Sequence, residues 1–501
     1  MLTGKNYVGY DLSAESNSIF ESINPETEKK NNKFHNATEG EINKAVEKAK
    51  NAFLEYSAKT AEERAGFLDT IAEEILGLGE ELISTYCQES GYPEGRANGE
   101  RGRTVGQLKA FATYIRTENW KDSFEDKADP NRSPLPKPGI LRTSIPIGPV
   151  AVFGASNFPL AFSTAGGDTA SALAAGSPVV VKAHPSHPGT GELVASAIIN
   201  AAKKTGMPEG VFSHLNGNTN EVGTLLVTHP GIKGVGFTGS LKAGRALYDL
   251  AAKREEPIPV FAEMGSVNPV VVSSSTLQKR GKEVAHQLAG SFNLGAGQFC
   301  TSPGIIFTVG SEGLSEFEKE LVGSSSQINA QCMLNKGIKQ AFEKGKKTVS
   351  CSPYITVLSE SNEEEGNRVT GSIVKVSSKN FIENDKLQEE VFGPFTMLVT
   401  CDNIKELNKT IDNLKGQLTA SLIAEKEEFK DLKTTIQLLQ HKAGRIIFNA
   451  MPTGVEVSAA MTHGGPYPAS TDSRFTSVGI PAIKRWLRPV SFQDFPQELL
   501  P

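Results

Sequence analysis

The chain has 501 residues, 57 acidic and 52 basic side chains, and a formal net charge of -5. Hydrophobic residues make up 38% and charged residues 22%, which are ordinary values for globular proteins and exclude disordered and collagen-like classes. At this length we expect about three domains. No basic run and no alternation of basic and aromatic residues indicates a nucleic-acid surface, so we expect no nucleic-acid partner.

The cysteines and the apolar stretches indicate the compartment. The five cysteines are scattered and form no Cys-x-x-Cys pair, which argues against a disulfide framework and a zinc site. The first ten residues have no apolar core of signal-peptide length. The longest apolar stretch, near 170–181, is broken by Gly176, Ser177 and Pro178, so we expect no membrane span. We therefore predict a cytoplasmic protein without a metal site.

The first hundred or so residues are predicted to be helical. One face of 39–53 carries apolar residues at helical spacing: Ile42, Ala45, Val46, Ala49 and Phe53. The sequence Thr60-Ala-Glu-Glu63 has the pattern of a capping box, so a second helix is expected to continue through Leu78. A third helix is expected to follow Gly99–Thr104. We expect these helices to support a central element.

Prolines mark a connecting arm. Residues 129–138 contain four prolines, each of which removes a backbone donor and disfavours helix in the residue before it. Residues 140–146 then alternate apolar and polar side chains at strand spacing, and 489–493 could form a terminal strand. Because an exposed strand edge is commonly covered by another chain, we expect a homodimer or homotetramer.

From Gly148 to Val272 the pattern alternates between strand and helix. Short buried strands are predicted at 149–154, 177–182, 211–215, 232–237 and 259–262, with helices near 160–175, 189–204, 221–228 and 241–253. This alternation is typical of a doubly wound parallel sheet, which binds its ligands beyond the carboxyl ends of the strands.

Cys300 lies in the most unusual segment of the chain, Gly295-Ala-Gly-Gln-Phe-Cys300-Thr-Ser-Pro-Gly304. Its glycines permit backbone conformations closed to other residues and would let a ligand approach the main chain closely. The setting favours a nucleophile. A lone cysteine is more often a small buried hydrophobe, and this segment alone leaves that alternative open.

Three further features follow predicted strands. Gly234-Val-Gly-Phe-Thr-Gly239 matches G-x-G-x-x-G before a helix at Ser240, which suits an anion such as a pyrophosphate, although a serine-capped turn explains it equally well. Asn157 would present a neutral amide to an oxyanion, and one such hydrogen bond stabilises a transition state by about 3 kcal/mol. Alternatively, the Asn157 side chain caps a turn. Glu263 ends a buried strand, where desolvation would raise its proton affinity for general-base work unless it forms a structural ion pair.

Six short segments occur in an order and at a spacing that chance does not explain. They are Ala155-Ser-Asn157-Phe-Pro159, Val179-Val-Val-Lys182, Phe237-Thr-Gly-Ser240, Glu263-Met-Gly265, Gly297-Gln-Phe-Cys300 and Glu389-Glu-Val-Phe-Gly-Pro394. In the order and the spacing of these segments, the chain resembles the aldehyde dehydrogenase superfamily over nearly its whole length. The resemblance implies an aldehyde dehydrogenase-like α/β fold. Its parts are a Rossmann-type doubly wound dinucleotide-binding domain (1–129 and 148–272), a second α/β catalytic domain (273–479) and a β-ribbon oligomerisation arm (130–147 and 480–501).

The resemblance also implies residue roles. Cys300 is the nucleophile, Asn157 and the Cys300 amide form the oxyanion hole, and Glu263 activates the hydrolytic water. The implied reaction is thiolate attack on an aldehyde, hydride transfer to a nicotinamide cofactor, and hydrolysis of the thioester. The implied cofactor-binding residues are Lys182 at the adenosine ribose, Ser240 at the pyrophosphate, Glu390 at the nicotinamide ribose and Phe392 beside the nicotinamide, together with Pro185, Thr238, Gly239 and Gly265.

Longer segments narrow the resemblance to one branch. Segments 99–104, 291–304, 452–457 and 463–471 look like the 2,5-dioxopentanoate (α-ketoglutaric semialdehyde) dehydrogenases and related NADP-using fatty aldehyde dehydrogenases. For the former, a substrate carboxylate should meet an arginine, with Arg101 and Arg103 as candidates, although charges at a helix start explain both. Phe158, Phe162 and Phe292 could line either tunnel, so a long-chain aldehyde is the alternative. A catalytically silent binding protein is the remote alternative.

The choice between NAD and NADP turns on one position. NAD-preferring members of the resembled family often carry a glutamate three residues after the strand lysine, where it repels a 2′-phosphate. Here that position is Pro185. Residues 217–222 also contain no arginine that could bind a 2′-phosphate. We therefore expect the protein to use both NADP and NAD.

Overall fold

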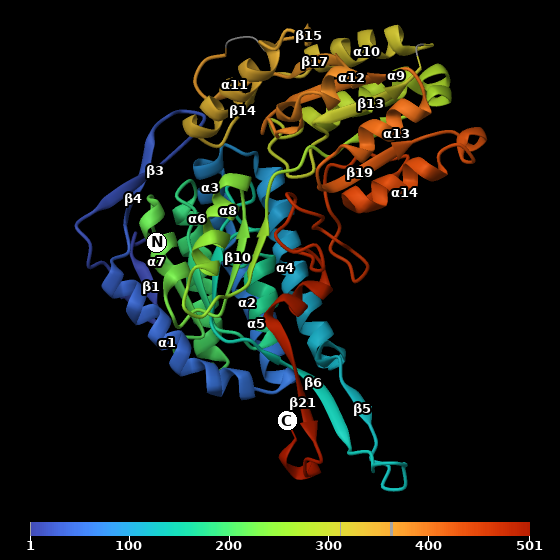
Figure 1. The fold of residues 1–501 in the computed structure, drawn as a ribbon. Helices are drawn as coiled ribbons and strands as arrows, with labels where there is room; N and C mark the ends of the chain where they lie inside the picture. Colours follow the sequence, from blue (N-terminus) through green and yellow to red (C-terminus); the bar gives the residue numbers. More distant parts are fainter. Residues whose placement is uncertain (1, 311, 361–363, 501) are drawn as a thin grey trace.

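The computed structural model describes residues 2–310, 312–360 and 364–500. Two α/β domains, each built on a seven-stranded sheet, lie one above the other in Figure 1, and a β-ribbon projects from the lower domain. None of the helices in the described ranges combines the length and the apolar character needed to cross a bilayer.

The first sheet has the strand order β11-β10-β7-β8-β9-β1-β2. Five consecutive strands, from β11 to β9 in this order, run parallel: β7 (Val150–Phe153), β8 (Val179–Lys182), β9 (Phe212–Leu215), β10 (Gly234–Thr238) and β11 (Val260–Glu263). They are mostly buried because helices cover both faces, which explains their near-continuous apolar sequences. The predicted doubly wound sheet is confirmed. The antiparallel edge strands β1 (Asn6–Val8) and β2 (Asp11–Ser13) were not predicted.

Helices on both sides hold this sheet. They are α1 (Glu39–Ala58), α2 (Ala61–Gly77), α3 (Gly79–Ser90), α4 (Glu94–Arg116), α5 (Gly167–Ala175), α6 (Pro188–Lys204), α7 (Asn220–Thr228) and α8 (Leu241–Ala252). The capping box of α2 is confirmed, since Thr60 and Glu63 bond reciprocally. Segment 99–104 lies inside α4 rather than before it. Its glycines each cost the helix about 1 kcal/mol, which burial of the apolar face of α4 outweighs.

The second domain has the strand order β15-β17-β18-β13-β12-β19-β20. The strands are β12 (Val270–Val272), β13 (Ile305–Val309), β15 (Thr356–Ser359), β17 (Ser372–Ser377), β18 (Phe395–Cys401), β19 (Gln417–Ile423) and β20 (Ala443–Phe448). The helices are α9 (Ser274–Asn293), α10 (Leu314–Ser326), α11 (Lys336–Ser350), α12 (Ser378–Ile382), α13 (Ile404–Asp412) and α14 (Lys433–Lys442). Because β12 pairs with β13 and β19, the boundary expected after residue 272 is wrong and lies between Glu263 and Val270.

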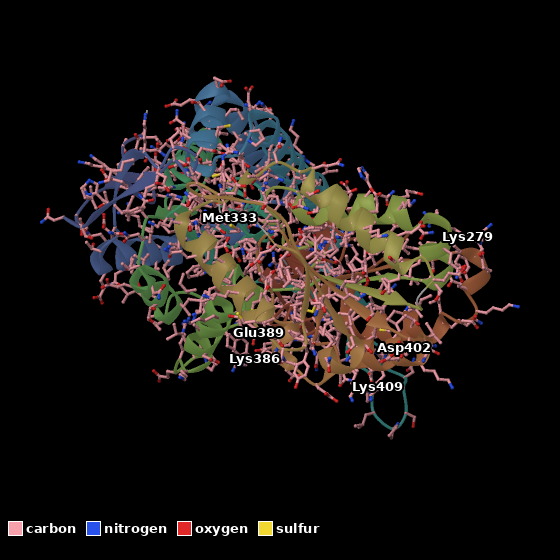
Figure 2. The ribbon with its side chains drawn as sticks, turned by 90° about the horizontal axis from the view of Figure 1, so that it is seen from above. Lys279, Met333, Lys386, Glu389, Asp402 and Lys409 are labelled. Carbon is pink, nitrogen blue, oxygen red and sulfur yellow. The ribbon has the colours of Figure 1, made fainter. Side chains whose placement is uncertain are left out.

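Two short antiparallel pairs of strands lie outside the two large sheets. They are β3 (Ile19–Ile23) with β4 (Lys30–His35), and β14 (Gln331–Cys332) with β16 (Arg368–Val369). Figure 2 views the molecule from above, with Met333, next to β14, near the first domain and Lys279 at the far rim of the second. Met333 is fully buried.

The ribbon consists of β5 (Phe124–Asp126), β6 (Ile140–Pro146) and β21 (Leu487–Gln493), in the order β21-β6-β5. It projects away from both domains (Figure 1). The predicted strands at 140–146 and near the carboxyl terminus are confirmed. The expected bounds need correction, because the ribbon begins at β5, before residue 130. Residues 480–486 form a 3-10 helix whose Trp486 is buried against α5, where its indole N–H donates to Ser171.

The chain crosses back to the first domain after β20. Ser470 pairs with Glu263 at the end of β11, the Met264 amide donates to Ala469, and the Thr471 amide donates to Ala262. Segment 464–479, expected within the second domain, therefore packs on the edge strand of the first sheet. This return carries His463 to the junction of the two domains.

Candidate active site

The residues predicted to carry the chemistry meet at the carboxyl edge of the first sheet. Asn157 follows β7, Glu263 ends β11, and Cys300 lies in the loop between α9 and β13. The Asn157 side-chain amide donates to the Gln298 carbonyl at 3.0 Å, which joins the first domain to the cysteine loop. Parallel strands present their carboxyl ends on one edge, so residues far apart in sequence come together there.

Close backbone packing and hydrogen bonds hold the cysteine loop in place. Gly297 has a φ of +65°, and a Cβ at this residue would overlap the Gly393 carbonyl. A Cβ at Gly295, whose φ is +59°, would lie 2.7 Å from Arg96 Nη1. Asn268 donates to the carbonyls on both sides of Thr301, at 2.8 and 2.9 Å. These glycines thus let the loop pack against neighbouring protein, and because Gly295 also lines a cavity of about 760 Å³, the expectation that they admit a ligand stays a prediction.

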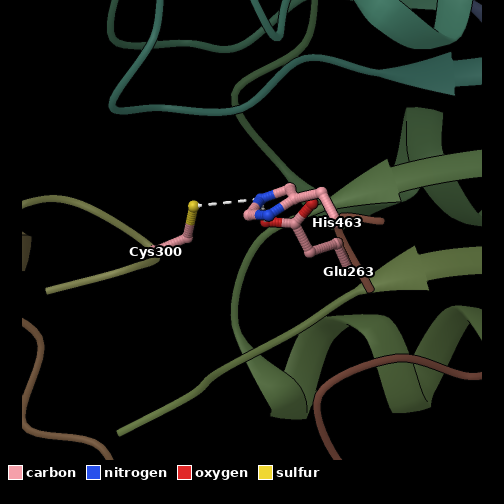
Figure 3. Close-up of side chains that lie close together, drawn as sticks. All are labelled: Glu263, Cys300 and His463. Atoms are coloured by element: carbon pink, nitrogen blue, oxygen red, sulfur yellow. Dashed lines mark hydrogen bonds and ion pairs between the residues drawn. The ribbon is translucent and has the colours of Figure 1, made fainter. Parts of the chain in front are cut away.

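Cys300, His463 and Glu263 form a continuous chain of contacts (Figure 3). Cys300 Sγ lies 3.4 Å from His463 Nε2, and the same nitrogen lies 3.0 Å from Glu263 Oε1. Ser477 Oγ donates to the other carboxylate oxygen at 2.5 Å. His463 is fully buried and Glu263 is 3% exposed. Because a carboxylate only accepts, the His463 Nε2–H donates to Glu263 while facing the sulfur, and Glu263, which also hydrogen-bonds with the thiol, can accept the Cys300 proton.

The charges in this chain of contacts differ from the expectation. Burial alone would raise the pKa of the Glu263 carboxyl, but His463 and Ser477 together bring the pKa below its usual value. The carboxylate is therefore charged at neutral pH. Burial and the neighbouring Glu263 charge raise the pKa of the Cys300 thiol well above its ordinary value. A base must then take the thiol proton as the sulfur attacks, and the Glu263 carboxylate, which hydrogen-bonds with this thiol, can do so.

The same three side chains also have the donor types that bind metals. Their ligand atoms lie within 4.8 Å of one another. The contacts within this group are explained by hydrogen bonds and an ion pair. The absence of a metal site stays a prediction.

Two N–H groups are available to an oxyanion beside Cys300. The Asn157 amide has two N–H donors, and only one is used by Gln298. Within the described part of the chain, the backbone N–H of Cys300 donates to no protein acceptor. Both groups can therefore bind an oxygen atom that gains negative charge near the sulfur.

A cavity of about 330 Å³ opens on Cys300 from one side. It contains six of the residues predicted for catalysis or cofactor binding besides Cys300 and Glu263: Asn157, Thr238, Gly239, Ser240, Glu390 and Phe392. Ser240 caps α8, with its hydroxyl oxygen accepting from the Ala243 amide at 3.3 Å. Gly265 lies so close to Glu390 that a Cβ at residue 265 would be 2.7 Å from the Glu390 carboxylate. Burial raises the pKa of Glu390 to about 7.

Lys182 and Pro185 lie at the end of β8. Lys182 donates to the Gly217 carbonyl at 2.7 Å, and burial lowers the pKa of its ammonium group to about 8. Among the described residues, no carboxylate forms a salt bridge with it. A buried ammonium without a carboxylate partner fits a hydroxyl-rich or anionic ligand, and the helix amino terminus at Ser240 suits a pyrophosphate. The residues present therefore fit a nicotinamide dinucleotide.

A second cavity, of about 760 Å³, lies between α4 and the cysteine loop. Its lining includes Arg103 and Phe158, both predicted for substrate binding, and also Tyr92, Arg96 and Phe299. Arg103 donates to the Val455 carbonyl, and its guanidinium lies 5.7 Å from the ring of Phe162. Phe162 in turn lies 6.3 Å from the ring of His463.

Two predicted substrate residues lie elsewhere. The Arg101 guanidinium donates to the Gly79 carbonyl and to Asn98, so it is tied to the surface of α3 and α4. Phe292 is fully buried in the core of the second domain, packed with Val284 and Leu288 of α9. The prediction that Phe292 lines the tunnel is wrong, because the buried face of α9 points into this core rather than toward Cys300.

Comparison with known proteins agrees with this geometry. The model of the aldehyde dehydrogenase family matches residues 12–477. The chain belongs to the aldehyde dehydrogenase family. It is 42% identical to alpha-ketoglutaric semialdehyde dehydrogenase 2 of Azospirillum brasilense, over 100% of this chain and 96% of that protein. It is 44% identical to alpha-ketoglutaric semialdehyde dehydrogenase of Acinetobacter baylyi, over 99% of this chain and 95% of that protein. The chain is thus an enzyme of this family, an aldehyde-oxidising oxidoreductase.

Solved structures share the aldehyde dehydrogenase fold. Betaine aldehyde dehydrogenase of Staphylococcus aureus, solved with NAD+, superposes with a TM-score of 0.85 at 19% identity, covering 99% of each chain. Aldehyde dehydrogenase C of Pseudomonas syringae, solved with NAD+ and octanal, gives a TM-score of 0.84 at 20% identity and covers 98% of this chain and 97% of that chain. Members of the family thus bind NAD+ and aldehydes.

Sequence reasoning missed two residues at this aldehyde dehydrogenase site. His463 was noted only within the segment 463–471, and no role was predicted for it. A histidine preceding Gly464-Gly465 in a glycine- and proline-rich tail was the available signal. Arg96 lies next to Asn157 in the structure, but nothing in its local sequence distinguishes it from other helix-surface arginines.

Proposed function

We propose that this enzyme oxidises 2,5-dioxopentanoate, the α-ketoglutaric semialdehyde, to 2-oxoglutarate, with Cys300 as its nucleophile. The observation that carries this proposal is the Cys300–His463–Glu263 chain beside a cavity lined by Arg103, which forms no salt bridge with a carboxylate among the described residues. An arginine in such a cavity favours a substrate that ends in a carboxylate. The names of the two relatives at 42% and 44% identity support the same substrate.

The first step uses the proton path at Cys300. The Glu263 carboxylate accepts the thiol proton as Cys300 Sγ attacks the aldehyde carbon, and the His463 Nε2–H, which faces the sulfur, stabilises its negative charge. The carbonyl oxygen gains negative charge and is held by Asn157 Nδ2 and the Cys300 amide. A nicotinamide bound in the 330 Å³ cavity would accept the hydride as this oxyanion collapses to a thioester.

The second step releases the acid. Glu263, once it has passed the thiol proton to solvent, can take a proton from a water molecule that attacks the Cys300 thioester. Because His463 and Ser477 hold the pKa of Glu263 below its usual value, the carboxylate stays in its basic form through neutral pH. Collapse of the second tetrahedral intermediate then expels the Cys300 thiolate. The same oxyanion hole serves both steps.

The substrate is tested by an aldehyde panel with Arg103→Met. We expect wild type to prefer 2,5-dioxopentanoate over hexanal and decanal. The variant should lose about 10- to 100-fold in kcat/KM for 2,5-dioxopentanoate alone, because a hydrogen bond to a charged group contributes about 1.5–3 kcal/mol. Arg101→Met, on the same helix, is the control and should change nothing. Wild-type preference for decanal would favour the long-chain alternative, for which Phe158 and Phe162 could form the apolar wall.

Both NAD and NADP are proposed as cofactors, because Pro185 places no carboxylate beside Lys182. Pro185→Glu should raise KM for NADP at least about 10-fold and leave KM for NAD within about threefold, since a carboxylate there repels a 2′-phosphate. Pro185→Gln is the control of equal size without charge. Steady-state kinetics with each cofactor measure the effect. Equal changes in both KM values would place Pro185 away from the 2′-position.

A homodimer or homotetramer in the cytoplasm is also proposed. The ribbon leaves the edges of β5 and β21 unpaired within the described chain, and Phe124 of β5 is 67% exposed. All five cysteines are free, which fits a reducing compartment.

A further inference from the structure

Arg96 of α4 lies among three aromatic rings beside the candidate active site. Its guanidinium carbon is 3.5 Å from the centroid of the Tyr92 ring, 5.2 Å from Phe158 and 5.0 Å from Phe299. Such stacking on ring faces stabilises a planar cation, and the Arg96 side chain is only partly exposed. Gly295 leaves room for it, since a Cβ there would lie 2.7 Å from Arg96 Nη1. The Arg96 side chain is therefore held in one position.

The contacts of Arg96 join the two halves of the proposed oxyanion hole. Its Nη2 donates to the backbone carbonyl of Asn157 at 2.8 Å. Phe158 follows Asn157 in the chain, and Phe299 precedes Cys300. The two rings also meet edge to face, with centroids 5.3 Å apart. One guanidinium thus touches a residue next to each oxyanion donor, one from the first domain and one from the second.

No salt bridge in the described chain employs Arg96. An ion-paired arginine would be explained by its carboxylate partner, whereas this guanidinium donates to the Asn157 carbonyl and interacts with the buried Glu100 without forming a salt bridge. The fork geometry of arginine allows one nitrogen to donate while the plane stacks on rings, which a lysine ammonium cannot reproduce.

We propose that Arg96 is a positioning residue, which sets the distance between the Asn157 amide and the Cys300 amide across the domain junction. The inference rests on the proposed role of these two groups in holding the oxyanion. Arg96 acts through Asn157 and the two phenylalanines, without touching the reacting atoms. A displacement of about 1 Å in such a donor costs roughly 100-fold in rate.

The test uses Arg96→Met, Arg96→Lys and the control Arg101→Met in the full-length enzyme. Rapid mixing measures the first turnover with 2,5-dioxopentanoate and with pentanal, which has five carbons and no carboxylate. Arg96→Met should slow the first turnover about 10- to 100-fold with both aldehydes, with KM changed less than about threefold. Arg96→Lys should recover part of this loss, because it keeps a cation on the rings. Arg101→Met should match wild type.

The rate of Cys300 alkylation by iodoacetamide separates positioning from a merely structural role, because only a structural role of Arg96 would change this rate. This reaction forms no oxyanion, so its rate should stay within about twofold of wild type in Arg96→Met. An equal fall in alkylation and turnover would show a collapsed site and overturn the inference. A loss seen only in KM for 2,5-dioxopentanoate would make Arg96 a substrate anchor and also overturn it. Failure of the proposed substrate is separate, since it appears in wild type and leaves the pentanal comparison intact.

Discussion

Cys300→Ser should abolish aldehyde oxidation, with kcat reduced about 10⁴-fold or more. Removing a nucleophile that acts with its base as a unit costs nearly the whole covalent pathway, and serine is a much weaker nucleophile at neutral pH. The assay is aldehyde-dependent formation of reduced nicotinamide at saturating substrate. Cofactor binding should persist, because Cys300 is only one of the residues that line the cofactor cavity.

The control for this variant is Cys351→Ser. Cys351 is exposed at the end of α11, so the same chemical change there should leave kcat within about twofold. Normal turnover by Cys300→Ser would contradict the assignment of the nucleophile. It would also remove the reason for the Cys300–His463 contact.

Glu263→Gln should separate the two half-reactions. The first turnover should be slower than in wild type but still release about one equivalent of reduced cofactor, because the His463 N–H remains to stabilise the Cys300 thiolate. Steady-state turnover should then fall about 10²- to 10⁴-fold, since the glutamine amide cannot take the proton from the hydrolytic water. Stopped-flow absorbance measures the burst, and intact-protein mass spectrometry detects the acyl group retained on Cys300.

Glu256→Gln is the matched control for Glu263→Gln. Glu256 forms a surface ion pair with Lys233 at 2.7 Å and lies outside the site, so its loss should change neither phase. An unchanged hydrolysis rate in Glu263→Gln would refute the base role. A first turnover slowed as much as steady-state turnover would make the thiol proton, rather than the hydrolytic water, the limiting task of Glu263.

The fold was largely predictable from local patterns. Alternating buried strands and helices between Gly148 and Val272 predicted the doubly wound sheet, because strand and helix periodicity are properties of neighbouring residues. The Thr60–Glu63 capping box and the strand at 140–146 were local signals of the same kind. The boundary near Val272 was not predictable, since β12 could pair with either sheet and its pairing with β13 and β19 is a long-range choice.

The candidate site divides in the same way. By itself the sequence singled out Cys300, Asn157 and Glu263, because strand ends and an unusual glycine segment are visible without a structure. Only the tertiary structure brought His463 to Cys300 and Glu263, by returning the chain from β20 to the edge of the first sheet. It also moved Phe292 into a core, tied Arg101 to the surface, and set Arg96 between Asn157 and the cysteine loop. These outcomes depend on contacts between residues far apart in the chain, and local composition carries no record of which distant residues will meet.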